Sequence, residues 1–106
     1  MRRSEAMDKP VTVFKICNGG AKTGYFSACG YDLRYYMGRY VVARAQARPE
    51  LYVFATEEDA RNSGFVGTLF KARAQEEMPI PAFLNPRGGQ RCYRRVKLIK
   101  NLGRIE

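Results

Sequence analysis

Short stretches in which β-branched and aromatic residues predominate run along most of the chain, and they predict β-strands. Residues 11–17 contain two valines, an isoleucine and a phenylalanine, which is typical of a strand. Residues 25–29 indicate a return strand. Between them Asn18-Gly19-Gly20 favours a turn, because Asn and Gly tolerate positive φ. We therefore expect a hairpin that places Tyr25 opposite Cys17.

The middle of the chain predicts three more strands. Residues 31–36 and 39–44 are interrupted by Met37-Gly38, a candidate tight turn, so we expect these two segments to pair with each other. Residues 51–55 are apolar at every position. A strand without polar alternation is typical of one that is covered on both faces, and it is therefore expected to be central.

One short helix is predicted after this apolar segment. Thr56 is a good N-cap, and the acidic residues 57–59 suit the positive end of a helix dipole. Ser63-Gly64 is expected to end the helix. The predicted helix therefore spans about residues 57–62.

The rest of the chain predicts two longer strands that are separated by a loop. Residues 65–74 alternate well enough for a strand, whereas residues 75–89 hold three prolines and two glycines and favour a loop. Residues 91–100 alternate again, and residues 101–106 are expected to form a short tail.

Together these elements predict an α+β fold of strand-rich type. We expect a twisted, mainly antiparallel sheet of six to seven short strands with the one short helix. Residues 1–9 are mostly polar and are expected to be a flexible tail, so the predicted single domain spans 10–106.

The net positive charge of the chain and its distribution along the sequence favour an anionic partner. The 106 residues carry 19 Lys and Arg against 10 Asp and Glu, a net charge of +9. Residues 1–48 contribute +6, residues 49–77 contribute −3 and residues 78–106 contribute +6. A basic face of this kind favours nucleic acid or an acidic protein as partner, although a merely solvated surface is the alternative. The longest apolar runs are too short to cross a membrane, so a cytoplasmic protein is expected.

The residue types present argue against several kinds of enzyme. The sequence has no histidine, which removes Ser-His-Asp and Cys-His catalysis and histidine metal ligands. Its three cysteines, Cys17, Cys29 and Cys92, form no Cys-x-x-Cys pair and are expected to be buried thiols. The carboxylates show no spacing that favours acid–base catalysis. The sequence therefore predicts a protein that is not an enzyme and has no cofactor or metal.

Basic and aromatic residues near the C-terminus form the first candidate site. Strand alternation would place Tyr93, Arg95 and Lys97 on one face, where cations could neutralise phosphates and the ring could stack on a base. Charged protection of an edge strand is the alternative explanation. The predicted nucleic-acid-binding residues are Arg87, Arg91, Tyr93, Arg94, Arg95, Lys97 and Lys100.

A group of tyrosines forms the second candidate site. Alternation predicts that Tyr35 points inward and Tyr36 outward. Exposed tyrosines next to arginine are typical of protein-binding surfaces, so Tyr36, Arg39 and Tyr40 are predicted to bind a protein. Ordinary cross-strand aromatic packing is the alternative.

Residues 36–39, 51–60 and 67–72 together resemble small uncharacterised domains that are common in phages, viruses and microbes. These domains share a Gly-Lys or Gly-Arg turn, an apolar strand with Phe, a Thr- or Ser-capped short helix and a further strand. The resemblance implies an α+β fold and a viral or mobile-element origin, and it implies no activity. The same layout is similar to part of ADP-ribosyltransferase-like folds, but the Ser/Thr-x-Ser strand of those enzymes is missing here.

Three functional hypotheses follow. The first is a small non-enzymatic binding protein whose basic surface binds nucleic acid. It would act inside a cell, and a virus-infected host cell is one such setting. The second is a protein–protein interaction module that docks on a host protein or self-associates as a homodimer. The third is a degenerate ADP-ribosyltransferase-like enzyme.

Overall fold

The computed structural model describes residues 9–20, 24–27, 33–43, 51–80 and 88–105. Arg87, Cys29 and the predicted N-terminal tail up to residue 8 lie outside these ranges. The elements in chain order are β1 (Val11–Gly20), β2 (Gly24–Ser27), β3 (Arg34–Tyr35), β4 (Tyr40–Val42), β5 (Leu51–Phe54), α2 (Glu57–Arg61), β6 (Gly67–Met78) and β7 (Gln90–Ile105).

The prediction of an α+β fold is wrong, because strands dominate the described chain. Its one helix, α2, has five residues and forms no layer of its own. The strands β6 and β7 have 12 and 16 residues and are longer than expected. The fold is therefore close to all-β, although the expected antiparallel pairing and the single short helix are present.

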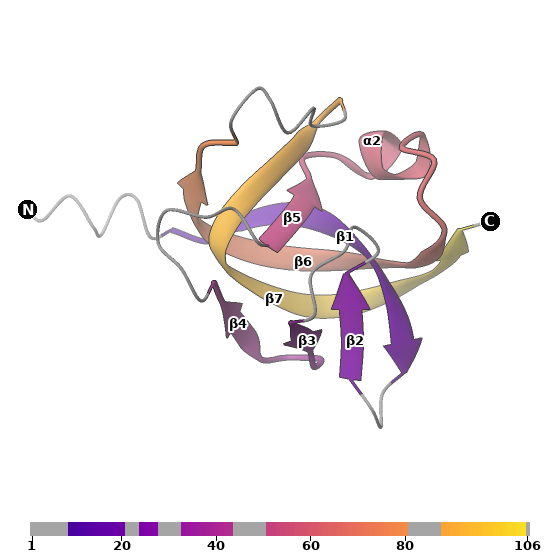
Figure 1. Cartoon of the computed structure of the whole chain (residues 1–106), viewed down its shortest axis with the longest axis horizontal. Helices are drawn as coiled ribbons and strands as arrows, with labels where there is room; N and C mark the ends of the chain where they lie inside the picture. Colours follow the sequence, from indigo (N-terminus) through magenta and orange to yellow (C-terminus); the bar gives the residue numbers. More distant parts are fainter. Residues whose placement is uncertain (1–8, 21–23, 28–32, 44–50, 81–87, 106) are drawn as a thin grey trace, which may run out of the picture.

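Four strands close into a small barrel. β1 pairs with β6, β6 with β7, β7 with β5, and β5 returns to β1, all in antiparallel fashion. The link between β5 and β1 is one residue pair, Phe14 opposite Phe54. Hairpin strands β2 and β3 extend the sheet from β1, and β4 adds to β7. Figure 1 shows how strongly β6 and β7 curve around this ring.

Two bulges in β7 explain its curvature and its length. Leu98 is opposite Ala72 but Lys100 is opposite Lys71, so Ile99 is an extra residue on β7. Leu102 is extra in the same way further along the strand. Each bulge bends a strand and increases its twist. The strand therefore continues around the barrel to Ile105, where the sequence predicted a tail.

Side chains from β1, β5, β6 and β7 fill the barrel, together with Tyr35 and Ala43. The interior cluster consists of Val13, Cys17, Tyr35, Ala43, Leu51, Val53, Phe70, Ala72, Ala74, Val96 and Leu98. The alternation predicted for the last strand is confirmed, because Cys92, Val96 and Leu98 are all buried. Cys17 and Cys92 are buried, as predicted.

A lysine also lies inside the barrel. Lys15 alternates inward between Val13 and Cys17 and is only 1% exposed. Its ammonium donates a hydrogen bond to the carbonyl oxygen of Tyr52 on β5 and lies 5.1 Å from the centroid of the Tyr35 ring. The aliphatic stem of the lysine thus takes part in the core, while its charged end is held by a carbonyl and a ring.

The helix covers a second cluster on the outer face of β1 and β6. Ile16, Phe54, Ala60, Leu69 and Ile105 are buried there. The predicted cap is confirmed, since the Thr56 hydroxyl accepts a hydrogen bond from the backbone N–H of Asp59 at 3.0 Å. The short helix therefore closes one side of the barrel rather than building a separate layer.

Three predictions of pairing and turns are wrong. Cys17 is opposite Ser27 and Gly19 is opposite Tyr25, so Asn18-Gly19-Gly20 belongs to β1 and is not a turn. Met37-Gly38 is a turn as predicted, but β3 pairs with β2 and β4 pairs with β7. Residues 75–78 continue β6 rather than starting a loop, because β7 provides backbone partners up to Met78.

Candidate functional site

The basic strand β7 lies inside the sheet and not at its edge. It pairs with β6 along one side, and with β5 and β4 along the other. Charged residues protect an edge by repelling a second chain from unpaired backbone groups. Because β7 has strand partners on both sides from Cys92 to Lys97, edge protection does not explain the charges of Arg95 and Lys97.

Two rows of side chains cross the outer face of β4, β7 and β6. Directly opposite residues in antiparallel strands project from the same face. Tyr40, Lys97 and Arg73 form one row. Val42, Arg95 and Gln75 form the next row. We call these six residues the basic face; it holds three cations and no carboxylate.

Tyr40 makes cation–π contacts with both cations that β7 contributes to the basic face, Arg95 and Lys97. The guanidinium carbon of Arg95 lies 5.0 Å from the centroid of the Tyr40 ring, and the ammonium of Lys97 lies 4.8 Å from the same centroid. The negative potential of a ring face attracts both cations. This attraction offsets the repulsion between two like charges on the same side of one strand. Arg95 and Lys97 are therefore held close together before any ligand arrives.

Arg95 is half-buried, and the Nε of its guanidinium is buried without a hydrogen-bond partner among the described residues. A buried donor without a partner costs free energy. Because Nε is out of reach of the surface, an anion near Arg95 and Lys97 would be attracted by their two positive charges and not by this donor.

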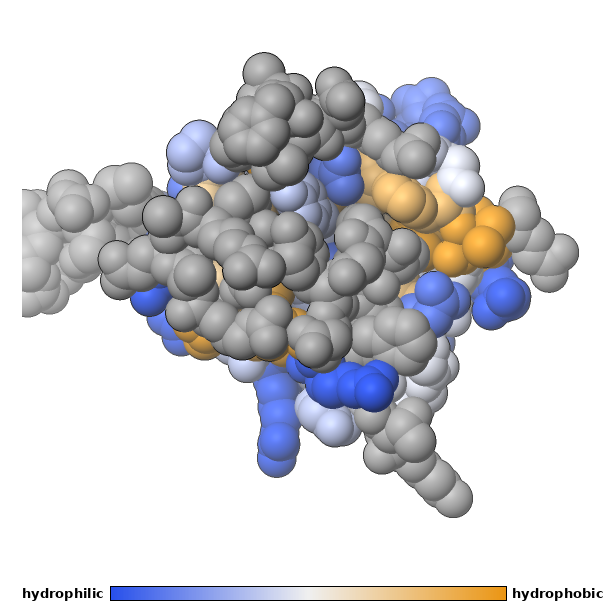
Figure 2. All heavy atoms as spheres, in the orientation of Figure 1, coloured by the Kyte–Doolittle hydropathy of each residue, from blue (hydrophilic) through white to orange (hydrophobic). Residues whose placement is uncertain are grey.

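The turn between β3 and β4 is held against β7. The backbone N–H of Gly38 donates to the carbonyl of Leu98 at 2.9 Å, so this turn lies against β7 just beyond Lys97. Tyr36 and Met37 on the turn are 40% and 42% exposed, and Val42 on β4 is 47% exposed. Arg39 is also exposed. Of the residues predicted to bind a protein, Tyr40 thus belongs to the basic face, and Tyr36 and Arg39 lie on the turn just before it. Figure 2 shows strongly hydrophilic side chains projecting on the side where β3 and β4 lie.

Other predicted site residues lie elsewhere or play different parts. Lys100 is exposed and opposite Lys71, beyond the first bulge. Arg94 is half-buried on the inward side of β7, where its carbonyl accepts from Ala43 N–H at 2.8 Å. Tyr93 is partly buried and packs on the interior cluster, so its ring is not an open stacking surface. The sequence did not single out Arg73, because its position beside Lys97 depends on the pairing of β6 with β7.

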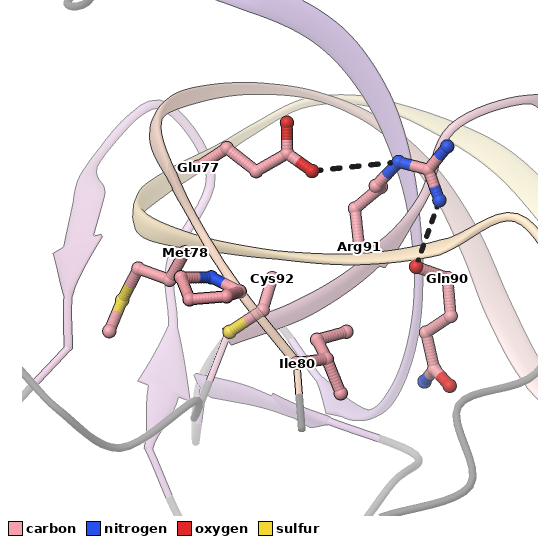
Figure 3. Close-up of a pocket in the computed structure, with 7 residues that line it drawn as sticks. Glu77, Met78, Ile80, Gln90, Arg91 and Cys92 are labelled. Atoms are coloured by element: carbon pink, nitrogen blue, oxygen red, sulfur yellow. Dashed lines mark hydrogen bonds and ion pairs between the residues drawn. The ribbon is translucent and has the colours of Figure 1, made fainter. Parts of the chain in front are cut away.

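Arg91 lines a separate cleft where β6 ends and β7 begins. Its guanidinium lies 3.6 Å from the Glu77 carboxylate and donates to the Gln90 carbonyl at 3.2 Å (Figure 3). The cleft has a volume of about 520 Å³, and Met78, Ile80 and Cys92 give it an apolar floor. Within the described ranges, no three His, Cys, Asp or Glu residues come together as a metal site.

Burial raises the pKa of the Tyr93 phenol, and the Glu77 carboxylate opposite it raises that pKa further, while Arg91 partly opposes the shift. Since the fold favours the neutral phenol, its contribution to stability is complete below the unfolded pKa of about 10 and is lost as pH rises through the higher folded pKa. We expect Glu77→Gln to move the pKa of Tyr93 back toward its ordinary value.

The titration is measured from tyrosinate absorbance, as the difference between each protein and its Tyr93→Phe counterpart. Glu57→Gln on α2 is the matched control, because it removes the same charge on a different element. An unchanged Tyr93 titration in Glu77→Gln would show that the carboxylate contributes nothing.

Comparison with protein-family models, with curated proteins and with solved structures finds no match to this chain. Within the part of the chain that the structure describes, every helix is too short or too polar to traverse a bilayer.

Proposed function

We propose that this chain is a non-enzymatic nucleic-acid-binding protein whose basic face contacts the phosphate backbone. The observation that carries the proposal is the pair of cations, Arg95 and Lys97, gathered over the ring of Tyr40. Arg73 adds a third cation in the same row as Lys97. A phosphodiester backbone presents repeated anions that such a cluster can neutralise.

Nucleic acid fits this surface better than an isolated small anion. The three cations lie side by side on two neighbouring strands, where Arg73 is exposed and Arg95 and Lys97 are half-buried. The net charge of +9 adds a long-range attraction toward any polyanion. Val42, which is opposite Arg95, is exposed and provides apolar surface that a sugar or base can cover, and Met37 and Tyr36 are exposed on the turn that precedes β4.

The test is fluorescence anisotropy with labelled short DNA and RNA at several salt concentrations. Wild-type protein is expected to bind, with affinity that falls steeply as salt rises. The double variant Arg95→Gln/Lys97→Gln is expected to lose roughly tenfold or more in affinity at low salt. Its salt slope should fall by about 1.4 to 1.8, because each phosphate that a cation no longer neutralises removes about 0.7 to 0.9.

Arg61→Gln provides the matched control. It removes one positive charge from α2, where Arg61 is exposed and paired with Glu57 at 2.8 Å. If Arg61→Gln weakened binding as much per charge as the double variant, binding would depend on net charge and not on the basic face. Absence of binding by wild-type protein even at low salt would overturn the proposal and leave this surface as a docking site for an acidic protein.

A further inference from the structure

Tyr36 is placed differently from Tyr40. Tyr35 of β3 points into the barrel and is 1% exposed, and Tyr36 follows it on the outer side. A Cβ atom added to Gly24 would lie 2.9 Å from Cζ and 3.0 Å from the hydroxyl oxygen of Tyr36. The ring therefore packs directly on the bare backbone of Gly24, although 40% of the residue stays open to solvent.

The two tyrosines thus offer different chemistry to a ligand. Tyr40 is half-buried and its ring is already engaged by Arg95 and Lys97. Tyr36 packs on Gly24 and remains exposed to solvent. An exposed ring that already packs on the backbone is suited to stacking, because its side chain loses little further conformational entropy when a flat partner binds.

Backbone hydrogen bonds hold the turn that carries Tyr36 against β7. The carbonyl of Tyr36 accepts from the N–H of Arg39 at 3.1 Å, which closes the turn. The N–H of Gly38 donates to Leu98, the residue after Lys97. The turn that carries Tyr36 is therefore held against β7 at the residue after Lys97, and a polymer that extends from Arg95 and Lys97 along this turn would reach the ring.

We infer that the ligand of the basic face is a single-stranded polynucleotide, with a base stacked on Tyr36. This inference rests on the proposed function. A duplex keeps its base faces stacked inside, so it would leave the exposed Tyr36 and Met37 uncovered. A single strand can turn its bases outward onto an aromatic side chain while its phosphates follow the cations. DNA and RNA single strands share this chemistry.

Four probes of about 12 nucleotides, within the range of known single-strand site sizes, test the inference. They are oligo(dT), oligo(U), a DNA duplex of the same length and an abasic strand that has phosphates but no bases. Wild-type protein is expected to bind a single strand more tightly than the duplex at equal salt. The difference between oligo(dT) and oligo(U) shows which sugar is preferred.

Substitution of the ring separates stacking from charge. Tyr36→Ala is expected to weaken oligo(dT) or oligo(U) binding roughly 5- to 150-fold, the range that corresponds to about 1–3 kcal/mol per stacked base. Its salt slope and its binding of the abasic strand should stay unchanged. Tyr36→Phe keeps the ring and should bind like wild type, and thermal unfolding of both variants reports whether the turn is intact.

The outcomes distinguish this inference from the proposed function. If the duplex binds as well as single strands and Tyr36→Ala changes neither, the inference is overturned while the proposed function stands. If Tyr36→Ala weakens the abasic strand equally, Tyr36 acts only through the structure of the turn, and the inference is again overturned. If wild-type protein binds none of the probes, the proposed function itself fails.

Discussion

Gly67→Ala is expected to destabilise the protein by about 2 to 5 kcal/mol, through overpacking and a strained backbone together. Gly67 begins β6 with a φ of 149°, in a region that side chains other than glycine rarely adopt. An added Cβ would lie 2.7 Å from the Cys17 carbonyl oxygen and 3.0 Å from Cγ2 of Ile16. The backbone of β1 cannot move away without breaking its pairing with β6.

Urea denaturation of the wild type and two variants measures this effect. Gly20→Ala is the matched control, because Gly20 lies on β1 and a Cβ there would meet nothing within 4 Å. Its unfolding midpoint should stay close to that of wild type, while that of Gly67→Ala falls sharply. Equal midpoints for the two variants would show that the contact between Gly67 and β1 imposes no constraint.

Lys15→Ala is expected to cost about 2 to 4 kcal/mol of stability. The substitution removes a long side chain from a fully buried position and leaves a cavity, as truncation of a buried Leu or Met does. It also removes the donor to the Tyr52 carbonyl. Lys15→Met should recover part of the loss, because it refills the volume of the stem without restoring the hydrogen bond.

Equilibrium unfolding in urea at neutral pH compares the two substitutions. The expected order of stability is wild type, then Lys15→Met, then Lys15→Ala. If Lys15→Ala unfolded at the wild-type midpoint, the side chain would contribute nothing to the barrel interior. If Lys15→Met were no more stable than Lys15→Ala, filling the interior volume would not matter there.

Features that depend on neighbours in sequence could be predicted well. Thr56 and the acids after it specify a helix start within one turn, and the structure confirms it. Alternation along residues 92–98 correctly separated buried from outward positions. Both signals come from the local periodicity of helix and strand, which does not depend on how distant segments pair.

Features that depend on distant pairing could not be predicted. Glycine pairs usually mark turns, but Gly19 and Gly20 continue β1 because β2 supplies backbone partners to both. The basic face arises because β4 and β6 lie on either side of Lys97, although Tyr40, Arg73 and Lys97 are far apart in sequence. The α+β prediction was wrong for the same reason, because the local sequence pattern does not show whether a sheet closes into a barrel.

The barrel closes at a junction between β1 and β5 that has little backbone pairing. Most neighbouring strands are joined by several residue pairs, but β1 and β5 meet at Phe14 and Phe54 alone. Lys15 follows Phe14 on β1, Tyr52 lies on β5, and their hydrogen bond crosses that junction. The buried ammonium of Lys15 thus adds a hydrogen bond between β1 and β5 where these strands share only one backbone residue pair. Without this hydrogen bond, we expect β5 to open locally, so that its amide protons exchange with solvent at a lower free energy than is needed to separate β6 from β7.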